Sequence, residues 1–168
     1  NMPTIGRPFY TPDFETALLD DWEEKIDKMM HITSKEDVVM MGGVPTWSVV
    51  LLNRILEYTG KSNMMEVWPN INAYLHGGVG FAPYREQFEA YFPDPDFIFQ
   101  EIYNASEGFI GIQDDQAIKN ILLLTDNGMF FEFEDMSSGE VVALEGVKPG
   151  VNYSLIMSTN AGLWRYRI

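Results

Sequence analysis

The sequence predicts an α/β fold, in which a mixed sheet with helices in the first two thirds of the chain is followed by an antiparallel β-hairpin region. Two observations predict this order. Up to about residue 115, helical patterns alternate with short apolar runs, as is typical of a sheet with parallel strands. Beyond residue 116, apolar runs flank turn residues such as Asn127-Gly128, a pair that favours a tight hairpin turn. We therefore divide the chain into an α/β part, residues 1–115, and an antiparallel part, residues 116–168.

Three helices are expected in the α/β part, after an extended lead-in over residues 1–10. Pro12 suits the first turn of a helix, whose apolar stripe recurs every three or four residues from Phe14 to Met30. Pro45 opens a second helix, and Gly60 fits its end. A third helix is expected over residues 83–92. The buried face of the second helix is expected to hold Trp47, Val50, Leu51, Ile55 and Tyr58.

Short apolar runs predict the strands. In the α/β part these runs cover residues 38–41, 71–75 and 97–103, and the first is expected to be buried. In the antiparallel part, residues 121–124 and 129–134 are expected to pair as a hairpin around Asn127-Gly128. A second strand pair, residues 153–158 and 163–168, is expected around Asn160-Ala161-Gly162.

Composition narrows the possible partners. The chain has 25 acidic and 11 basic residues, so its net charge of −14 argues against nucleic acid or an anionic membrane as a partner. It allows a nucleotide, because backbone N–H groups and a metal ion can bind phosphates. There is no cysteine, which excludes disulfides and thiolate sites and favours a cytoplasmic location. No leader and no apolar run of membrane-spanning length is recognised.

The segment at residues 100–111 offers a chemically useful set of side chains at the end of a strand. Tyr103 supplies a flat aromatic face, Ser106 a hydroxyl and Glu107 a carboxylate, which suits a nucleotide with its magnesium ion. A tight turn in solvent fits the same residues. The glycine-rich run at residues 76–80 also has two interpretations, because its glycines allow close approach of a ligand but equally suit a plain turn after a strand.

Other candidate sites have simpler explanations. His31 and His76 are the only histidines, and their spacing predicts no zinc site or Ser-His-Asp triad. The acidic pairs are interpreted as solvated surface rather than as a glycosidase dyad, and the methionine pairs as core. Residues 164–167 alternate aromatic and basic side chains, which fits either an amphipathic strand or an arginine beside a phosphate. The acidic pairs are Asp94/Asp96, Asp114/Asp115 and Glu132/Glu134.

Four segments in order resemble the auxin-responsive promoter family of acyl-acid amido synthetases, within the firefly-luciferase-like adenylate-forming superfamily. They are residues 43–47, 76–84, 103–108 and 161–168, and they are more similar to bacterial members than to plant ones. The resemblance implies that residues 1–168 are an internal fragment of the large N-terminal adenylating domain.

The resemblance also implies a reaction. ATP and a small carboxylic acid form an acyl-adenylate, and an amino acid then attacks it to give an amide. Ser106 and Glu107 would be catalytic, with Ser106 near the α-phosphate and Glu107 holding Mg²⁺. The other implied site residues are Gly77 and Gly78 on one wall of the adenine pocket of ATP or AMP, Tyr103 on the other wall, and Asn104, Ala105 and Phe109 beside the acyl group.

Three parts of the family's site have no match in these 168 residues: the phosphate loop, the ribose-binding aspartate after Tyr-Arg-Ile, and the catalytic lysine. We therefore expect the rest of the parent chain to be a partner, and this fragment to be inactive alone. A stand-alone ligand-binding or interaction domain with the same scaffold and no catalysis is the alternative.

Overall fold

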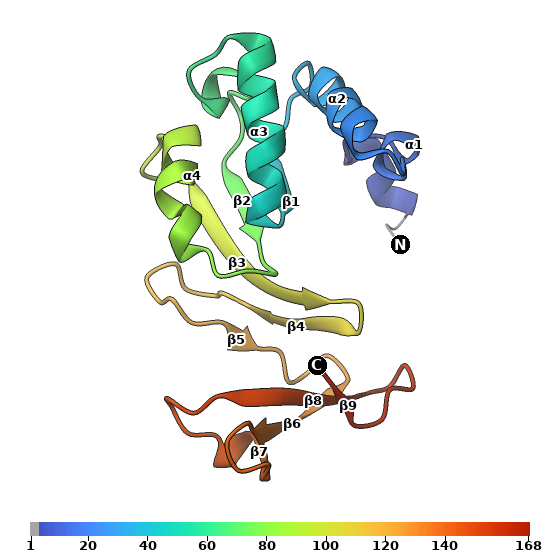
Figure 1. Cartoon of the computed structure of the whole chain (residues 1–168), viewed down its shortest axis with the longest axis vertical. Helices are drawn as coiled ribbons and strands as arrows, with labels where there is room; N and C mark the ends of the chain where they lie inside the picture. Colours follow the sequence, from blue (N-terminus) through green and yellow to red (C-terminus); the bar gives the residue numbers. More distant parts are fainter. Residues whose placement is uncertain (1–3) are drawn as a thin grey trace. The chain divides into compact units, whose positions relative to one another are not determined.

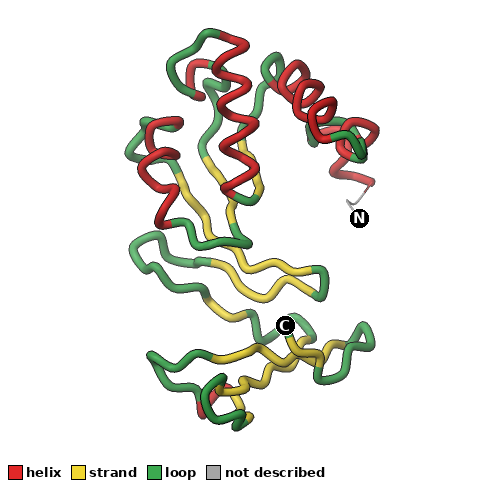
Figure 2. Tube along the Cα trace, viewed as in Figure 1, coloured by secondary structure: helices red, strands yellow, loops and turns green. Residues whose placement is uncertain are grey.

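The computed structural model describes residues 4–168, which form two compact units. The first unit contains the residues up to Ile102 together with Asp115–Lys119, and the second contains Tyr103–Asp114 and Asn120–Ile168. The α-helices all lie in the first unit, whereas the second consists of strands, loops and one short 3₁₀ turn (Figures 1 and 2). None of the described helices is both long and apolar enough to cross a membrane. The helices are η1 (Thr4–Phe9), α1 (Phe14–Ala17), α2 (Trp22–Thr33), α3 (Pro45–Thr59), η2 (Met64–Glu66), η3 (Ala82–Tyr84) and α4 (Arg85–Tyr91) in the first unit, and η4 (Leu144–Gly146) in the second.

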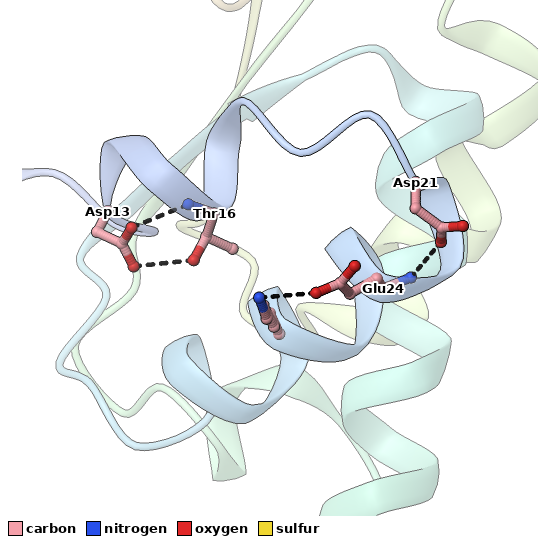
Figure 3. Close-up of polar contacts among 5 residues, drawn as sticks. Asp13, Thr16, Asp21 and Glu24 are labelled. Atoms are coloured by element: carbon pink, nitrogen blue, oxygen red, sulfur yellow. Dashed lines mark hydrogen bonds and ion pairs between the residues drawn. The ribbon is translucent and has the colours of Figure 1, made fainter.

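The N-terminal region differs from the expected extended lead-in and single long helix. The described residues of the lead-in form η1, and the apolar stripe from Phe14 to Met30 is divided between α1 and α2. Each helix has its own N-cap, because Asp13 accepts a hydrogen bond from the Thr16 amide (2.9 Å) and Asp21 accepts one from the Glu24 amide (2.8 Å; Figure 3). These caps satisfy amides that have no partner inside a helix, so the chain starts a new helix at Asp21 instead of continuing the first.

The second expected helix is confirmed as α3. Pro45 is its first residue, and Gly60 ends it with a φ of +67°, a conformation that glycine adopts without strain. The expected buried face is wrong for most of its members: Ile55 is buried, but Trp47 and Tyr58 are 56% and 48% exposed. Ser48, Leu52 and Ile55 recur at helical spacing and face the core instead, and Trp47 packs on Trp22 of α2 with ring centres 4.6 Å apart.

A mixed sheet has the strand order β1-β2-β3-β4-β5. Strands β1 (Met40–Gly43), β2 (Ala73–His76) and β3 (Ile98–Ala105) are parallel, as the sequence predicts, with Gly43 beside His76 and His76 beside Glu101. Strand β4 (Gly108–Ile112) pairs antiparallel with β5 (Leu122–Leu123). Strand β1 is not buried as expected, since Met40 is 56% exposed. The boundary between the two units falls within β3, after Ile102.

The core of the first unit is rich in aromatic residues. Tyr74 and Phe88 stack with centres 4.7 Å apart, and Phe92 stacks on Phe97 at 4.3 Å. The Trp68 indole donates a hydrogen bond to the Thr33 carbonyl (2.7 Å), which ties the loop before β2 to the end of α2. Figure 1 shows α3 and α4 beside the parallel strands whose side chains they cover.

The second unit contains a four-stranded antiparallel sheet with the order β7-β6-β8-β9. Its strands are β6 (Met129–Asp135), β7 (Val141–Ala143), β8 (Tyr153–Thr159) and β9 (Tyr166–Arg167). The expected pairing of β8 with β9 is confirmed. The expected hairpin around Asn127-Gly128 is wrong, because β5 pairs with β4 while β6 pairs with β8 over seven residues. The predicted fold class, a mixed sheet with helices followed by antiparallel strands, is confirmed.

Candidate functional site

His76 is the last residue of β2. It therefore lies at the carboxyl end of the parallel strands, where open α/β folds bind ligands. Its imidazole is 2% exposed and stacks on Phe81, with ring centres 3.8 Å apart. Neither ring nitrogen has a hydrogen-bond partner among the described residues. Burial, with a smaller effect from the nearby Arg85 cation, lowers the pKa of His76 to about 4. This histidine is therefore neutral at pH 7.

Gly77 and Gly78 follow His76, and the structure gives each a reason to be glycine. A Cβ atom at Gly77 would overlap the backbone carbonyl oxygen of Ile102. Gly78 has a φ of +80°, and a Cβ there would lie 3.4 Å from the Val44 side chain. Packing and turn geometry thus account for both glycines, so glycine at these positions does not by itself indicate a nucleotide.

A buried tyrosine fixes the start of α3 at the same end of the parallel strands. The Tyr74 hydroxyl donates to the Gly43 carbonyl oxygen (2.8 Å) and lies 3.0 Å from the Ser48 hydroxyl. Burial raises the pKa of Tyr74 to about 12, so its hydroxyl keeps its proton and remains a donor. The chain leaving β1 is thereby held in place next to the chain leaving β2.

The residues from Tyr103 to Phe109 form one β-hairpin in the second unit. Ser106 and Glu107 are the two turn residues between β3 and β4, Ser106 being exposed and Glu107 partly buried. Tyr103 and Phe109 are 38% and 39% exposed. The hairpin thus brings together the side chains that the resemblance assigns to the α-phosphate, the metal ion and the acyl group.

The two faces of this hairpin have different surroundings. Tyr103 lines a cavity of about 350 Å³ inside the second unit, and Ala105 packs against the core cluster that contains Ile110 and Met157. Asn104, between them in the strand, is exposed. The alternation of a β-strand accounts for this difference, since successive side chains point to opposite faces.

The implied adenine-pocket residues belong to separate units: Gly77 and Gly78 to the first, and Tyr103 to the second. Within residues 4–168, no three histidine, aspartate or glutamate side chains gather closely enough to hold a metal ion by themselves. Glu107 offers a single carboxylate on the turn. That donor is compatible with Mg²⁺, because this ion often takes only one or two protein carboxylates and completes its shell with water and phosphate oxygens.

Two ion pairs were not predicted from the sequence. Arg165 Nε lies 3.0 Å from Glu132 Oε2, and Arg167 Nε lies 3.0 Å from Glu134 Oε2. The Glu132 and Glu134 side chains are only 21% and 22% exposed, so their interpretation as solvated surface is wrong. The sequence signal that could have revealed these ion pairs is a matching spacing. The two glutamates are separated by one residue, and so are the two arginines, each in a strand-like segment.

Comparisons with known proteins agree with the resemblance. The profile of the GH3 family N-terminal domain matches residues 5–97, and that of the GH3 family central domain matches residues 122–168. The chain is also similar to a solved GH3.15 acyl acid amido synthetase, with 17% identity and a TM-score of 0.69 over 93% of this chain and 38% of that chain. The AtGH3.15 enzyme in complex with 2,4-DB gives 16% identity and a TM-score of 0.63 over 85% of this chain and 34% of that chain. None of the curated proteins matches.

At these identities the two structures show a shared fold, and this chain spans little more than a third of their length. The family profiles are independent of that likeness. Since the N-terminal domain profile alone covers more than half of the sequence, the chain belongs to the GH3 family, the auxin-responsive promoter family that its four motifs resemble.

Proposed function

We propose that this chain carries part of the ATP- and acid-binding site of an enzyme that adenylates a carboxylic acid and transfers the acyl group to an amino acid. The observation that carries the proposal is the match to two successive GH3 domains, together with a fold similar to that of an acyl acid amido synthetase. The complex of AtGH3.15 with 2,4-DB supports a small acid as the substrate class. A cytoplasmic location is part of the same proposal.

In this proposal, Glu107 and Ser106 act from the turn between β3 and β4. A bound Mg²⁺ would neutralise the negative charge that develops as pyrophosphate leaves. Glu107 would contribute one carboxylate oxygen to that ion, and the Ser106 hydroxyl would donate a hydrogen bond to an α-phosphate oxygen. Their position on the two-residue turn between β3 and β4 supports these roles, because the turn keeps the hydroxyl and the carboxylate within one short segment.

The remaining site residues would bind and orient the substrates. Gly77 and Gly78 would line one side of the adenine and Tyr103 the other. Asn104, Ala105 and Phe109 would lie beside the acyl group, where the small Ala105 leaves room for a ring. For the 168-residue chain alone we expect no adenylation, because it spans only 38% of the length of the similar synthetase.

A comparison of two glutamates tests the proposal. In the longer protein that contains this sequence, Glu107→Ala should lower acid-dependent ATP–pyrophosphate exchange by about 10²-fold or more, because the charge of the leaving group loses its metal ligand. Glu140→Ala is the matched control, since Glu140 is exposed and is not part of the hairpin. Magnesium titration should show a higher requirement for Glu107→Ala than for Glu140→Ala.

Exchange that is unchanged in Glu107→Ala would remove the metal role of this residue. If the longer protein catalyses no exchange with any carboxylic acid but still binds ligands, the alternative of a binding domain without catalysis would replace the proposal. Full exchange by the 168-residue chain alone would show that the fragment is sufficient, against our expectation.

A further inference from the structure

The second unit contains an apolar cavity whose lining residues, apart from Tyr103, have no role in the proposed reaction. Its volume is about 350 Å³, and strands of both sheets line it. Ile110 of β4 and Leu123 of β5 form one part of the wall, and Phe133 of β6 and Leu155 of β8 form another. This volume lies within the range of roughly 300–1,000 Å³ that is usual for small-molecule sites.

The rings of Tyr103, Phe133 and Tyr153 line the cavity together with aliphatic side chains, and no lining side chain is charged. Phe133 and Tyr153 meet edge to face, with ring centres 6.1 Å apart and an interplanar angle of 81°. The Tyr153 hydroxyl accepts a hydrogen bond from the Lys148 amide (3.2 Å), which restrains the ring. Tyr103 also lines the cavity and is 38% exposed, so the cavity borders a side chain that solvent reaches.

These features select one class of ligand. The cavity is partly open to solvent, and a flat hydrocarbon that enters it removes apolar surface from water. Aromatic walls favour a ring that can stack or meet them edge to face. A carboxylate would lose its hydration without meeting a cation, which is strongly unfavourable. We propose that this cavity binds a neutral aromatic compound of one or two rings, distinct from the acid substrate of the proposed enzyme.

Indole is a suitable probe, and indole-2-carboxylate is its charged counterpart with the same rings. By calorimetry on the 168-residue chain, indole should bind saturably with a Kd below about 1 mM, as expected for nine heavy atoms at moderate ligand efficiency. Indole-2-carboxylate should bind at least about tenfold more weakly. Intermolecular NOEs from indole should reach the rings of Phe133 and Tyr153.

Two valines provide matched variants. Val147 lines the cavity, whereas Val141 on β7 is 39% exposed and does not line it. Val147→Phe should weaken indole binding at least about tenfold by filling the space, and Val141→Phe should leave it unchanged. Leu123→Phe is a second filling variant if Val147→Phe does not fold. The proposal fails if wild-type protein shows no saturable indole binding, if the folded filling variants bind indole as tightly as wild type, or if the NOEs come only from other residues.

Discussion

His76 is an imidazole enclosed by aromatic rings, with no hydrogen-bond partner for either nitrogen among the described residues. Phe81 stacks on it at 3.8 Å and Tyr74 lies 5.6 Å away, while Arg85 sits over Phe81 at 5.1 Å. A charged imidazole in this place would lose its hydration and would face a like charge. The folded first unit therefore holds His76 in its neutral form.

This environment predicts a loss of stability in mild acid. The pKa of His76 is about 4 in the folded chain, against the ordinary histidine value of 6.5, which applies to the unfolded chain. A lowered folded pKa means that the unfolded chain binds the proton more readily. The stabilisation is therefore fully present above pH 6.5 and is lost as the pH falls towards 4. Between pH 7 and pH 5 the free energy of unfolding should drop by about 2 kcal/mol from this residue.

Urea unfolding at the two pH values measures this effect. His76→Phe keeps an aromatic ring against Phe81 and should remove most of the 2 kcal/mol drop, to within about 0.5 kcal/mol. His31→Gln is the control, because His31 is exposed on α2 and should leave the drop unchanged. Carboxylates titrate alike in all three proteins, so they cancel in the comparison. A drop of equal size in wild type and His76→Phe would contradict the prediction.

At the scale of elements, the ends of a helix could be predicted from the sequence where a single residue fixes the backbone conformation. Pro45 and Gly60 delimit α3 as predicted, because each acts through its own backbone geometry. The break between α1 and α2 was also encoded locally, in the spacing from Asp21 to Glu24 that is typical of an N-cap. The apolar stripe through this region obscured it, since the stripe continues across the break.

Strand pairing could not be read in the same way. The chain bends at Asn127-Gly128, where Gly128 has a φ of +80°, but the strands on either side of this bend pair with β4 and β8 rather than with each other. Pairing depends on which strands are available in three dimensions, and a local turn signal does not contain that information. The candidate site shows the same division. The segment from Tyr103 to Phe109 is continuous in sequence and was singled out, although its second strand, β4, was not predicted. The Arg165–Glu132 pair joins residues far apart in the sequence and was missed.

The N-cap of α2 gives a prediction at this scale. Asp21→Ala removes the hydrogen bond to the Glu24 amide and the favourable charge at the helix start, and should lower the free energy of unfolding by about 1 kcal/mol. Thermal unfolding followed by circular dichroism measures the change. Asp20→Ala is the control, because Asp20 is an exposed neighbour that lies just outside the cap. Equal effects of the two substitutions would show that general acidity, and not the cap, stabilises α2.

At the scale of the whole molecule, a large negative charge coexists with exposed apolar side chains. The net charge is −14. In the first unit Phe9 and Leu18 are 90% and 70% exposed, and in the second unit Trp164 is 82% exposed. Exposed apolar groups favour association, whereas like charges keep copies of a protein apart. Which of these effects prevails depends on the ionic strength, because salt screens the charges and leaves the apolar surface unchanged.

Self-association of this chain should therefore rise with salt. Between about 0.02 M and about 0.5 M NaCl the screening length falls from about 20 Å to about 4 Å, so repulsion no longer reaches across the gap between two approaching molecules. Sedimentation velocity should show mainly monomer at low salt and a growing fraction of larger species at high salt. The double variant Phe9→Ser, Leu18→Ser should reduce that fraction, since it removes apolar surface without altering charge. The same distribution at both salt concentrations would mean that charge does not limit association. If the double variant associates as much as wild type at high salt, the contact surface lies elsewhere on the chain.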